Sequence, residues 1–257
     1  MYTIGIDLGG TNIAAGLVDE NYKIIRKCSV PTEAERSADE IVKAMADVCQ
    51  RLCDEEGITV DDISSVGIAT PGTADTDKGE VIYANNLPFR NYPIASKLKA
   101  NFPVKKVAIA NDANAAAYGE AVAGAGAGKK NFVMLTLGTG VGGGIIIDGK
   151  LYTGFNYAAG ELGHMVIVHN GRPCTCGRKG CFEAYSSATG LINIINIFQP
   201  EVLSIGGGIS NEKDNLLAPL IPLVRAETYG SGIVQDTDIR IATLGNDAGI
   251  IGAALLG

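Results

Sequence analysis

The sequence lacks any apolar run of about 18 residues, the length that a membrane-spanning helix needs, so no membrane span is expected. It also lacks an excess of positive charge, because 21 Lys and Arg stand against 28 Asp and Glu, a net charge of −7. Nucleic acids and anionic membranes are bound by clustered Lys and Arg that neutralise phosphates, so neither partner is expected. The first residues include Asp7 and no basic segment, which argues against a secretory signal and predicts a cytoplasmic protein.

Charged residues are scarce at 19%, whereas hydrophobic residues make up 46%, so the chain can bury a substantial core and wholesale disorder is not expected. A length of 257 residues predicts one large domain or two small ones. Glycine is the residue in excess, at 34 of 257, and it follows no collagen period. Such a content indicates many tight turns and places where backbone approaches a ligand closely.

Predicted strands and helices alternate along the chain, which is typical of an α/β fold. The clearest helix starts after Ser37, which forms a capping box with Glu40, and ends near Gly57. Its apolar residues lie on one face of a 3.6-residue period: Ile41, Met45, Val48 and Leu52. Further strands are predicted at 63–69, 81–84, 107–110, 132–137, 145–147, 202–205 and 239–242. Further helices are predicted at 113–123, at 215–225 and after Asn246.

The opening pattern of strand, glycine turn, strand and second turn returns in the second half of the chain. Asp7 aligns with Thr136 at an offset of 129 residues (136 − 7), and at the same offset Val18 meets Ile147. This repetition predicts a duplicated α/β unit. Two similar lobes that face each other would make a cleft, and ligands bind in clefts between lobes.

Three glycine-rich segments, 7–12, 138–143 and 206–208, each follow or end a predicted strand. Exposed backbone N–H groups in such loops can cradle phosphates, and Thr11 and Thr139 add hydroxyl donors. Any one of them alone could be a simple tight hairpin, but three together favour a nucleotide. The second segment also matches the dinucleotide fingerprint G-x-G-x-x-G. We reject this match because a strand, and not the helix that the fingerprint opens, is predicted after it.

Three of the six cysteines are packed into eight residues, in the pattern C-x-C-x4-C formed by Cys174, Cys176 and Cys181. His164 precedes them by ten residues. Three thiolates and one imidazole make a closed tetrahedral zinc set, which is structural because no coordination position remains for water. The alternative is a cluster of reduced thiols without metal, and we favour zinc.

Carboxylates accompany these elements. Asp112 lies where a predicted strand meets a helix, so it is either an ordinary helix cap or a general base held at the carboxyl end of a strand. Glu161 and Glu183 flank the predicted metal ligands, which would fix both carboxylates around one pocket. Asp7, at the first phosphate loop, is a candidate partner of magnesium, usually through water.

Taken in order, the motifs resemble the ROK family, which comprises bacterial sugar kinases and related transcriptional repressors, and the match covers essentially the whole chain. The resemblance rests on Asp7-Leu8-Gly9-Gly10-Thr11-Asn12, Pro71-Gly72, Asn111-Asp112-Ala113-Asn114-Ala115, Gly138-Thr139-Gly140-Val141-Gly142, Glu161-Leu162-Gly163-His164, the C-x-C-G-x-x-G-C-x-E run that ends at Glu183, and Gly206-Gly207-Gly208. It implies a two-lobed actin/hexokinase-like (ribonuclease H-like) fold with duplicated lobes. It also implies Mg2+- and ATP-dependent phosphorylation of a hexose, and a homodimer.

The resemblance also implies roles for individual residues. Asp112 would be the catalytic base. The substrate would be bound by Gly72, Asn86, Asn111, Asp112, Glu161, His164 and Glu183. ATP would be bound by Asp7, Gly9, Gly10, Thr11, Asn12, Gly138, Thr139, Gly140, Gly206, Gly207 and Gly208, and structural zinc by His164, Cys174, Cys176 and Cys181. We expect a small N-terminal α/β lobe at 1–112 and a larger C-terminal lobe at 113–257 with the zinc knuckle, whose last helix packs back on the first lobe.

Two features refine the expected activity. The family's repressors add an N-terminal helix-turn-helix, whereas this chain starts at the first strand, so the kinase branch is favoured. Residues 183–190 resemble the glucokinase members, which predicts conversion of glucose to glucose 6-phosphate. The alternatives are a kinase for an N-acetylhexosamine such as N-acetylmannosamine, or a non-catalytic sugar-sensing module of the family.

One feature departs from the family. Between Leu191 and Ile192 its members carry a further helical stretch of roughly 50 residues, a substantial part of a domain, and this chain does not. We therefore predict an internal deletion at this point. It should remove helices of the larger lobe and contacts between subunits, while it leaves every motif residue present.

Overall fold

The computed structural model describes residues 1–138 and 140–257 and divides them into two compact units. Unit 1 comprises Met1–Gly119, Gly154–Ala158 and Asn246–Gly257, and unit 2 comprises Glu120–Thr153 and Ala159–Gly245. The units part inside a helix, after Gly119, whereas the sequence analysis placed the boundary at Asp112. Unit 1 holds more residues than unit 2, so the unit with the cysteine cluster is not the larger one in this chain.

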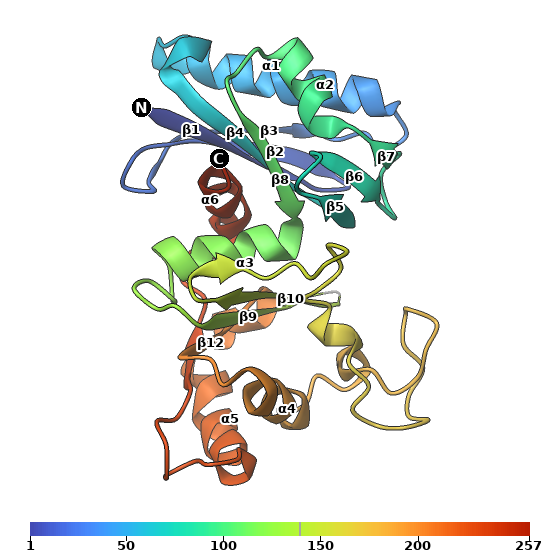
Figure 1. Cartoon of the computed structure of the whole chain (residues 1–257), viewed down its shortest axis with the longest axis vertical. Coiled ribbons are helices and arrows are strands. Elements are labelled where there is room, and N and C mark those ends of the chain that lie inside the picture. Colours follow the sequence, from blue (N-terminus) through green and yellow to red (C-terminus); the bar gives the residue numbers. More distant parts are fainter. Residues whose placement is uncertain (139) are drawn as a thin grey trace. The chain divides into compact units, whose positions relative to one another are not determined.

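Unit 1 is built on a five-stranded sheet with the order β3-β2-β1-β4-β8 (Figure 1). The first two pairings are antiparallel, and β1, β4 and β8 run parallel. The strands are β1 (Tyr2–Leu8), β2 (Asn12–Val18), β3 (Ile24–Pro31), β4 (Ile63–Thr70) and β8 (Val107–Asn111). A separate antiparallel sheet contains β5 (Thr73–Asp75), β6 (Glu80–Tyr83) and β7 (Arg90–Tyr92).

Helices cover both faces of the large sheet of unit 1. On one face lie α1 (Ala38–Glu56) and α2 (Ile94–Asn101), and on the other lies α6 (Ala248–Leu255), as Figure 1 shows. The predicted capping box of α1 is confirmed, because Ser37 and Glu40 exchange both of its hydrogen bonds, and Gly57 ends the helix in the left-handed conformation. The predicted apolar face of α1 is fully or almost fully buried.

Helix α6 comes from the end of the chain and packs directly on the backbone of the sheet. A Cβ atom at Gly5 of β1 would lie 1.8 Å from the carbonyl oxygen of Ile250. At Gly67 of β4 it would lie 1.7 Å from the carbonyl oxygen of Ala253. No real Cβ tolerates such distances, so this contact between helix and sheet requires glycine at both positions.

Unit 2 repeats the sheet of unit 1, with the order β11-β10-β9-β12-β13 and the same sequence of antiparallel and parallel pairings. Its strands are β9 (Phe132–Leu137), β10 (Val141–Ile147), β11 (Lys150–Leu151), β12 (Val202–Gly206) and β13 (Asp238–Ile241). Each strand of the first sheet therefore has a counterpart at the same position in the second sheet. The two sheets thus agree with the predicted duplication of an α/β unit.

The sequence analysis aligned both strands of the two hairpins at one offset of 129 residues. The strand registers show that this offset holds for the first strand only. In unit 1, Thr3 pairs with Val18, and in unit 2 Phe132 pairs with Ile146. The offset is therefore 129 between β1 and β9 but only 128 between β2 and β10, so Val18 corresponds to Ile146. The second hairpin loop is one residue shorter than the first, and this shifts every residue after it.

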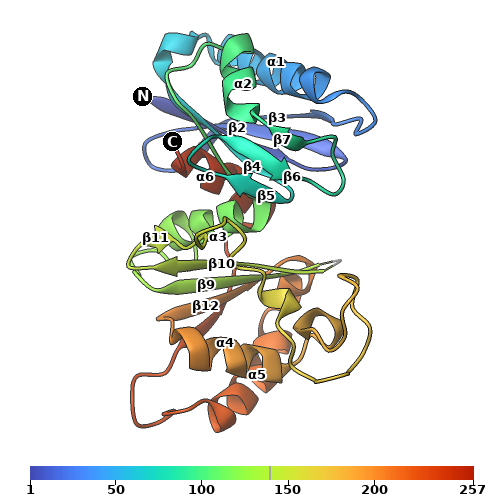
Figure 2. The same ribbon diagram turned by 45° about the vertical axis from the view of Figure 1, so that its right-hand side comes forward.

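The core of unit 2 lies between its sheet and two helices, α4 (Ala188–Phe198) and α5 (Asp214–Glu227), which pack on each other (Figure 2). Helix α4 runs without interruption through Leu191 and Ile192, the predicted deletion point. It buries Leu191, Ile194 and Ile195 almost completely in this core. The residues on either side of the deletion point therefore form one amphipathic helix. No helix among residues 1–138 and 140–257 is long and apolar enough to cross a membrane.

Helix α3 (Asp112–Ala123) carries a fully buried carboxylate, Glu120, at the first residue of unit 2. One carboxylate oxygen accepts the N–H of Leu244 at 2.6 Å, and the other accepts the N–H of Ala125 at 2.8 Å and the hydroxyl of Thr243 at 3.3 Å. Thr243 and Leu244 immediately precede the point at which the chain returns to unit 1. Glu120 therefore ties together two of the segments through which the chain passes from one unit to the other.

We expect Glu120→Gln to lower the free energy of unfolding by about 3 kcal/mol. The amide NH2 of glutamine would replace one carboxylate oxygen and face buried N–H and O–H groups that need an acceptor. Denaturant titration followed by circular dichroism measures this change. Glu227→Gln, at an exposed residue at the end of α5, is the matched control and should change stability by less than about 0.5 kcal/mol. Equal stabilities of the two variants would contradict the role of Glu120.

Candidate functional site

In unit 1, predicted site residues follow the carboxyl ends of three neighbouring parallel strands. Asp7 lies near the end of β1, Gly72 follows β4, and Asn111 ends β8. The side-chain N–H of Asn111 donates to the carbonyl of Gly72 at 3.0 Å, and its Oδ1 accepts the N–H of Asn114 at 3.2 Å. Asn111 therefore caps α3, while Asp112 is the first residue of that helix. Oδ1 of Asp112 accepts the N–H of Ala113 at 2.8 Å, so Asp112 also bonds a backbone N–H in the first turn of α3.

Two carboxylates at this edge have raised pKa values. Partial burial, and then the negative charge of Asp112, raise the pKa of Asp7 to about 6, against an opposing effect of Lys27. The pKa of Asp112 is also raised, mainly because protein surrounds much of the carboxylate, although its side chain still reaches solvent. Asp112 is thus accessible, and a raised pKa makes it a better proton acceptor than an ordinary surface aspartate.

The first glycine loop closes on itself, because the N–H of Gly9 donates to the carbonyl of Asn12 at 2.9 Å. Gly10, Thr11 and Asn12 are exposed. Asn86, a predicted sugar ligand, lies next to this loop, since a Cβ on Gly10 would be 3.7 Å from the Cβ of Asn86.

Thr32 holds this loop in place, and the sequence analysis did not single it out. It is fully buried and donates its hydroxyl to Gly9 at 2.7 Å and its N–H to Thr11 at 2.8 Å. Both bonds depend on the long-range pairing of β2 with β3, which no local signal reveals.

In unit 2, the other two glycine loops follow the neighbouring parallel strands β9 and β12, in which Gly206 pairs with Thr136. Gly138, which follows β9, and Gly207, which follows β12, therefore leave the same edge of the sheet. The predicted turn at 138–143 is too long, because β10 already begins at Val141. A strand follows this loop, which agrees with the rejection of the dinucleotide fingerprint. The predicted phosphate ligand Thr139 lies outside the described residues.

The four predicted zinc ligands converge in unit 2: one potential ligand atom from each lies within 4.8 Å of all the others. Nδ1 of His164 is 3.7 Å from Sγ of Cys174, and the sulfur atoms of Cys176 and Cys181 are also 3.7 Å apart. Zinc–sulfur bonds of roughly 2.3 Å place two sulfurs of a tetrahedral site about 3.8 Å apart. The donor spacing therefore fits zinc.

The chemistry of the donor set also fits a metal. Hydrogen bonds from Arg178 lower the pKa of the Cys176 thiol to about 6, which favours the thiolate that binds zinc. Arg178 also donates to the carbonyl of His164 at 2.9 Å and so connects the two ends of the cluster. Desolvation raises the pKa of the buried Cys181 to about 11, so metal binding at this thiol would release a proton near neutral pH.

Glu161 and Glu183 differ in their surroundings. Glu161 is exposed and precedes the short helix η2 (Leu162–His164). Glu183 is partly buried and accepts the hydroxyl of Thr175 at 2.6 Å and the N–H of Val141 at 3.0 Å, and these bonds contribute to a lowered pKa. Glu183 is therefore a stable carboxylate near neutral pH, suited to accept hydrogen bonds.

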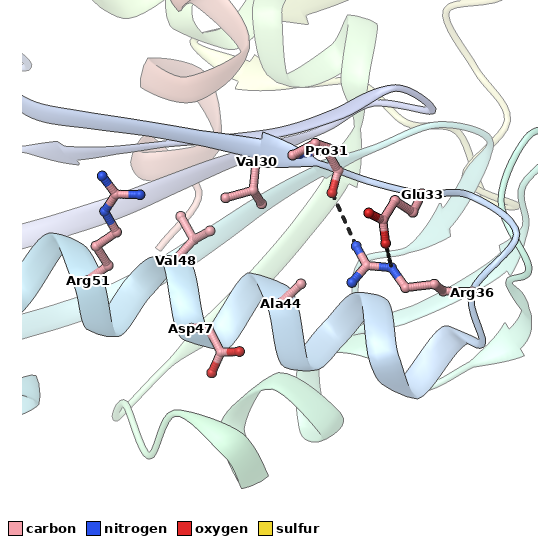
Figure 3. Close-up of a pocket in the computed structure, with 8 residues that line it drawn as sticks. All are labelled: Val30, Pro31, Glu33, Arg36, Ala44, Asp47, Val48 and Arg51. Atoms are coloured by element: carbon pink, nitrogen blue, oxygen red, sulfur yellow. Dashed lines mark hydrogen bonds and ion pairs between the residues drawn. The ribbon is translucent and has the colours of Figure 1, made fainter.

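A cavity of about 310 Å³ in unit 1 is lined by none of the predicted site residues (Figure 3). It lies between β3 and α1 and is lined by Val30, Pro31, Glu33, Arg36, Ala44, Asp47, Val48 and Arg51. Arg36 pairs with Glu33 at 3.2 Å and donates to the carbonyl of Pro31 at 3.1 Å. Proline has no N–H and its carbonyl is already bonded, so this end of the edge strand is protected from pairing with another chain.

Comparison with known proteins identifies the family. The ROK family profile matches residues 3–193 and 184–257, almost the entire chain. The chain belongs to the ROK family. A glucokinase of Halalkalibacterium halodurans is 32% identical over 312 residues, which cover 98% of this chain and 94% of the relative.

Solved ROK structures show the same fold. A ROK glucokinase from Streptomyces griseus, in complex with glucose and AMPPNP, has a TM-score of 0.83 and 31% identity and covers 100% of this chain and 99% of its own. A ROK hexokinase from Thermus thermophilus has a TM-score of 0.86 and 29% identity and covers 100% of this chain and 98% of its own. The two-lobed actin/hexokinase-like fold with a mixed α/β structure is thereby confirmed.

The same comparisons bear on the internal deletion. The alignment with the Halalkalibacterium halodurans glucokinase spans 312 positions, whereas this chain has 257 residues, so at least 55 positions (312 − 257) have no residue here. The two matched segments of the family profile overlap at 184–193, the stretch that contains Leu191 and Ile192. The chain therefore lacks residues that this relative carries.

The raised pKa of Asp7 predicts opposite effects of pH on stability and on nucleotide use. Its folded pKa of about 6 exceeds the value of about 4 in an unfolded chain, so the stability that it contributes is lost as pH rises from about 4 to 6. A cation needs the carboxylate, so affinity for Mg-ATP should fall as pH drops through about 6. Asp7→Asn should remove both dependences, stabilise the ligand-free chain at pH 7 by about 1–3 kcal/mol, and weaken nucleotide binding far more than sugar binding.

Denaturant titrations at pH 4.5 and 7, together with calorimetric titration of Mg-ATP and sugar, test this prediction. A wild-type chain whose Mg-ATP affinity does not change between pH 5 and 7 would contradict it. Equal losses of nucleotide and sugar binding in Asp7→Asn would indicate a folding defect instead of a role at the first phosphate loop.

Proposed function

We propose that this chain is a glucokinase, which transfers the terminal phosphoryl group of ATP to glucose and forms glucose 6-phosphate. The observation that carries the proposal is the similarity, over essentially the whole chain, to a glucokinase whose structure holds glucose and AMPPNP. We place the enzyme in the cytoplasm. The family resemblance supports a homodimer, whereas loss of the segment at Leu191 and Ile192 would remove contacts between its subunits.

Asp112 is the catalytic base in this proposal. Phosphoryl transfer leaves the protein little covalent chemistry, so its tasks are to position the substrates, to neutralise charge and to accept one hydroxyl proton. The carboxylate of Asp112 is accessible and has a raised pKa, and Asn111 beside it is anchored to Gly72. Asp112 would take the proton of the sugar hydroxyl, while Asn111 and Gly72 would bind neighbouring hydroxyls.

Glycine loops would hold the phosphates and the adenosine of ATP. In unit 1, Asp7 and the loop 9–12 would face phosphates and magnesium. In unit 2, the loop 138–140 would bind phosphate, and Gly206–Gly208 would bind the adenosine. Magnesium would neutralise charge on the phosphates. The role of Asp7 is to present a carboxylate near this ion, usually through a water molecule.

His164, Cys174, Cys176 and Cys181 would hold one structural zinc ion. Because Nδ1 of His164 faces Cys174, its Nε2 would remain free for a sugar hydroxyl. Glu161 and Glu183, on either side of the cluster in the sequence, would accept further hydroxyls of the sugar. Zinc would fix the loops that carry these three side chains.

Release of ADP over a panel of sugars tests the proposal. Turnover with glucose is expected, whereas turnover with N-acetylmannosamine only would identify an N-acetylhexosamine kinase. Sugar binding without turnover of any sugar would identify a sensor. Asp112→Asn keeps the shape and removes the basic oxygen, so kcat should fall by about 10²–10⁴-fold while glucose is still bound.

Glu161→Gln is the matched control for Asp112→Asn, because Glu161 would hold hydroxyls and so affect KM for glucose more than kcat. Near-normal turnover of Asp112→Asn would refute its role as the base. A comparable loss of kcat in Glu161→Gln alone would move that role to Glu161.

One zinc ion per chain is expected in freshly purified protein. Cys176→Ser should lose both the metal and sugar binding, because the loop that carries His164 and Glu183 would no longer be fixed. Elemental analysis and calorimetric titration with glucose measure the two losses. Cys53→Ser, in the core of unit 1, is the control and should keep the metal. Folded wild-type protein without zinc would contradict the prediction.

A further inference from the structure

The carboxylate of Glu183 connects two parts of unit 2 that the proposed function treats separately. One part is the cysteine cluster, and the other is the start of β10, which follows the second phosphate loop. Glu183 lies in the short helix η3 (Phe182–Ala184), directly after the last cysteine of the cluster. Its position is therefore tied to the fold of the cluster.

On the side of the cluster, Oε1 of Glu183 accepts the hydroxyl of Thr175 at 2.6 Å and lies 3.6 Å from Sγ of Cys174. Thr175 stands between Cys174 and Cys176, two predicted metal ligands. A short bond to a carboxylate is among the stronger hydrogen bonds in proteins. The orientation of Glu183 therefore depends on how the segment 174–176 is held.

On the side of the phosphate loop, Oε2 of Glu183 accepts the N–H of Val141 at 3.0 Å. A Cβ atom at Gly140 would lie only 2.6 Å from the same oxygen, so the carboxylate lies against the backbone of the loop. Val141 is buried and is the first residue of β10. The carboxylate thus fixes the point at which this loop enters the sheet.

Val141 is also contacted by the segment that contains His164. A Cβ atom at Gly163 would lie 2.1 Å from the carbonyl oxygen of Val141, so the two backbones are in direct contact. Gly163 belongs to the short helix η2, which also contains the histidine of the cluster. The residue that ends the phosphate loop is therefore enclosed by two segments, and the predicted metal ligands position both of them.

We propose that Glu183 is a positioning residue for the second phosphate loop and that it makes the affinity for ATP depend on occupancy of the zinc cluster. This inference rests on the proposed use of ATP. A carboxylate has about four acceptor sites, so Glu183 can hold Val141 and Thr175 and still accept a sugar hydroxyl. Zinc then acts on nucleotide binding as well as on the sugar ligands.

The first experiment measures the affinity of AMPPNP, without sugar, by calorimetric titration. Thr175→Val removes the 2.6 Å bond and leaves all four predicted metal ligands in place. We expect AMPPNP to bind about fivefold or more weakly, the lower end of coupling between sites, with one zinc per chain retained. Thr175→Ser keeps the hydroxyl and should restore binding. Thr189→Val, at an exposed threonine of α4, is the control and should bind as wild type does.

The second experiment is a cycle of metal removal and mutation, again with AMPPNP as the ligand. Removal of zinc by a chelator should weaken AMPPNP binding by wild type about fivefold or more, and by Glu183→Gln less than twofold, since the connection is already broken there. Circular dichroism checks that each sample is folded, and zinc added back should restore the affinity of wild type.

Two outcomes would overturn the inference. One is unchanged AMPPNP affinity in folded Thr175→Val. The other is an equal effect of metal removal in wild type and Glu183→Gln, which would mean that zinc acts on the nucleotide by another route or not at all. A wild-type chain that binds AMPPNP but phosphorylates no sugar would refute the proposed function and leave this test in force.

Discussion

Parallel strand pairing is the constraint on which the candidate site depends, because it brings the carboxyl ends of strands distant in sequence to one edge of a sheet. In unit 1 the pairing of β1 with β4 and of β4 with β8 assembles Asp7, Gly72 and Asn111 from three parts of the chain. In unit 2 the pairing of β9 with β12 brings two glycine loops to one edge. Any slip in these registers would separate residues that the pairing brings together.

Much of this arrangement could be predicted, because its signals are local. The capping box of Ser37 and Glu40 and the cysteine spacing each depend on a few neighbouring residues. Features that depend on distant partners could not be predicted. The end of the second glycine turn at Gly140 is set by the pairing of Val141 with Leu137, and the anchoring of the first loop by Thr32 is set by the pairing of β2 with β3.

The internal deletion shows which part of unit 2 can fold without the segment that its relatives carry. Helix α4 continues through the junction and buries Leu191, Ile194 and Ile195, so the core beneath the sheet stays closed. Some apolar side chains of α4 and α5 are not covered by any of the described residues. Ile197 of α4 is 63% exposed and Leu223 of α5 is 60% exposed. The residues on both sides of the junction therefore close the core of unit 2 with a single helix.

The carboxylates of the candidate site are distinguished by their surroundings, and this distinction assigns their chemistry. Asp112 and Asp7 are partly desolvated, which raises the pKa of both. Glu183 accepts hydrogen bonds from Thr175 and Val141, which hold its pKa below the usual value. A carboxylate with a raised pKa can take up a proton, whereas one stabilised by donors keeps its charge and fixes its neighbours. Asp112 combines a raised pKa with an accessible carboxylate, which suits it to accept a proton, whereas Glu183 is suited to fix the segments that it contacts in unit 2.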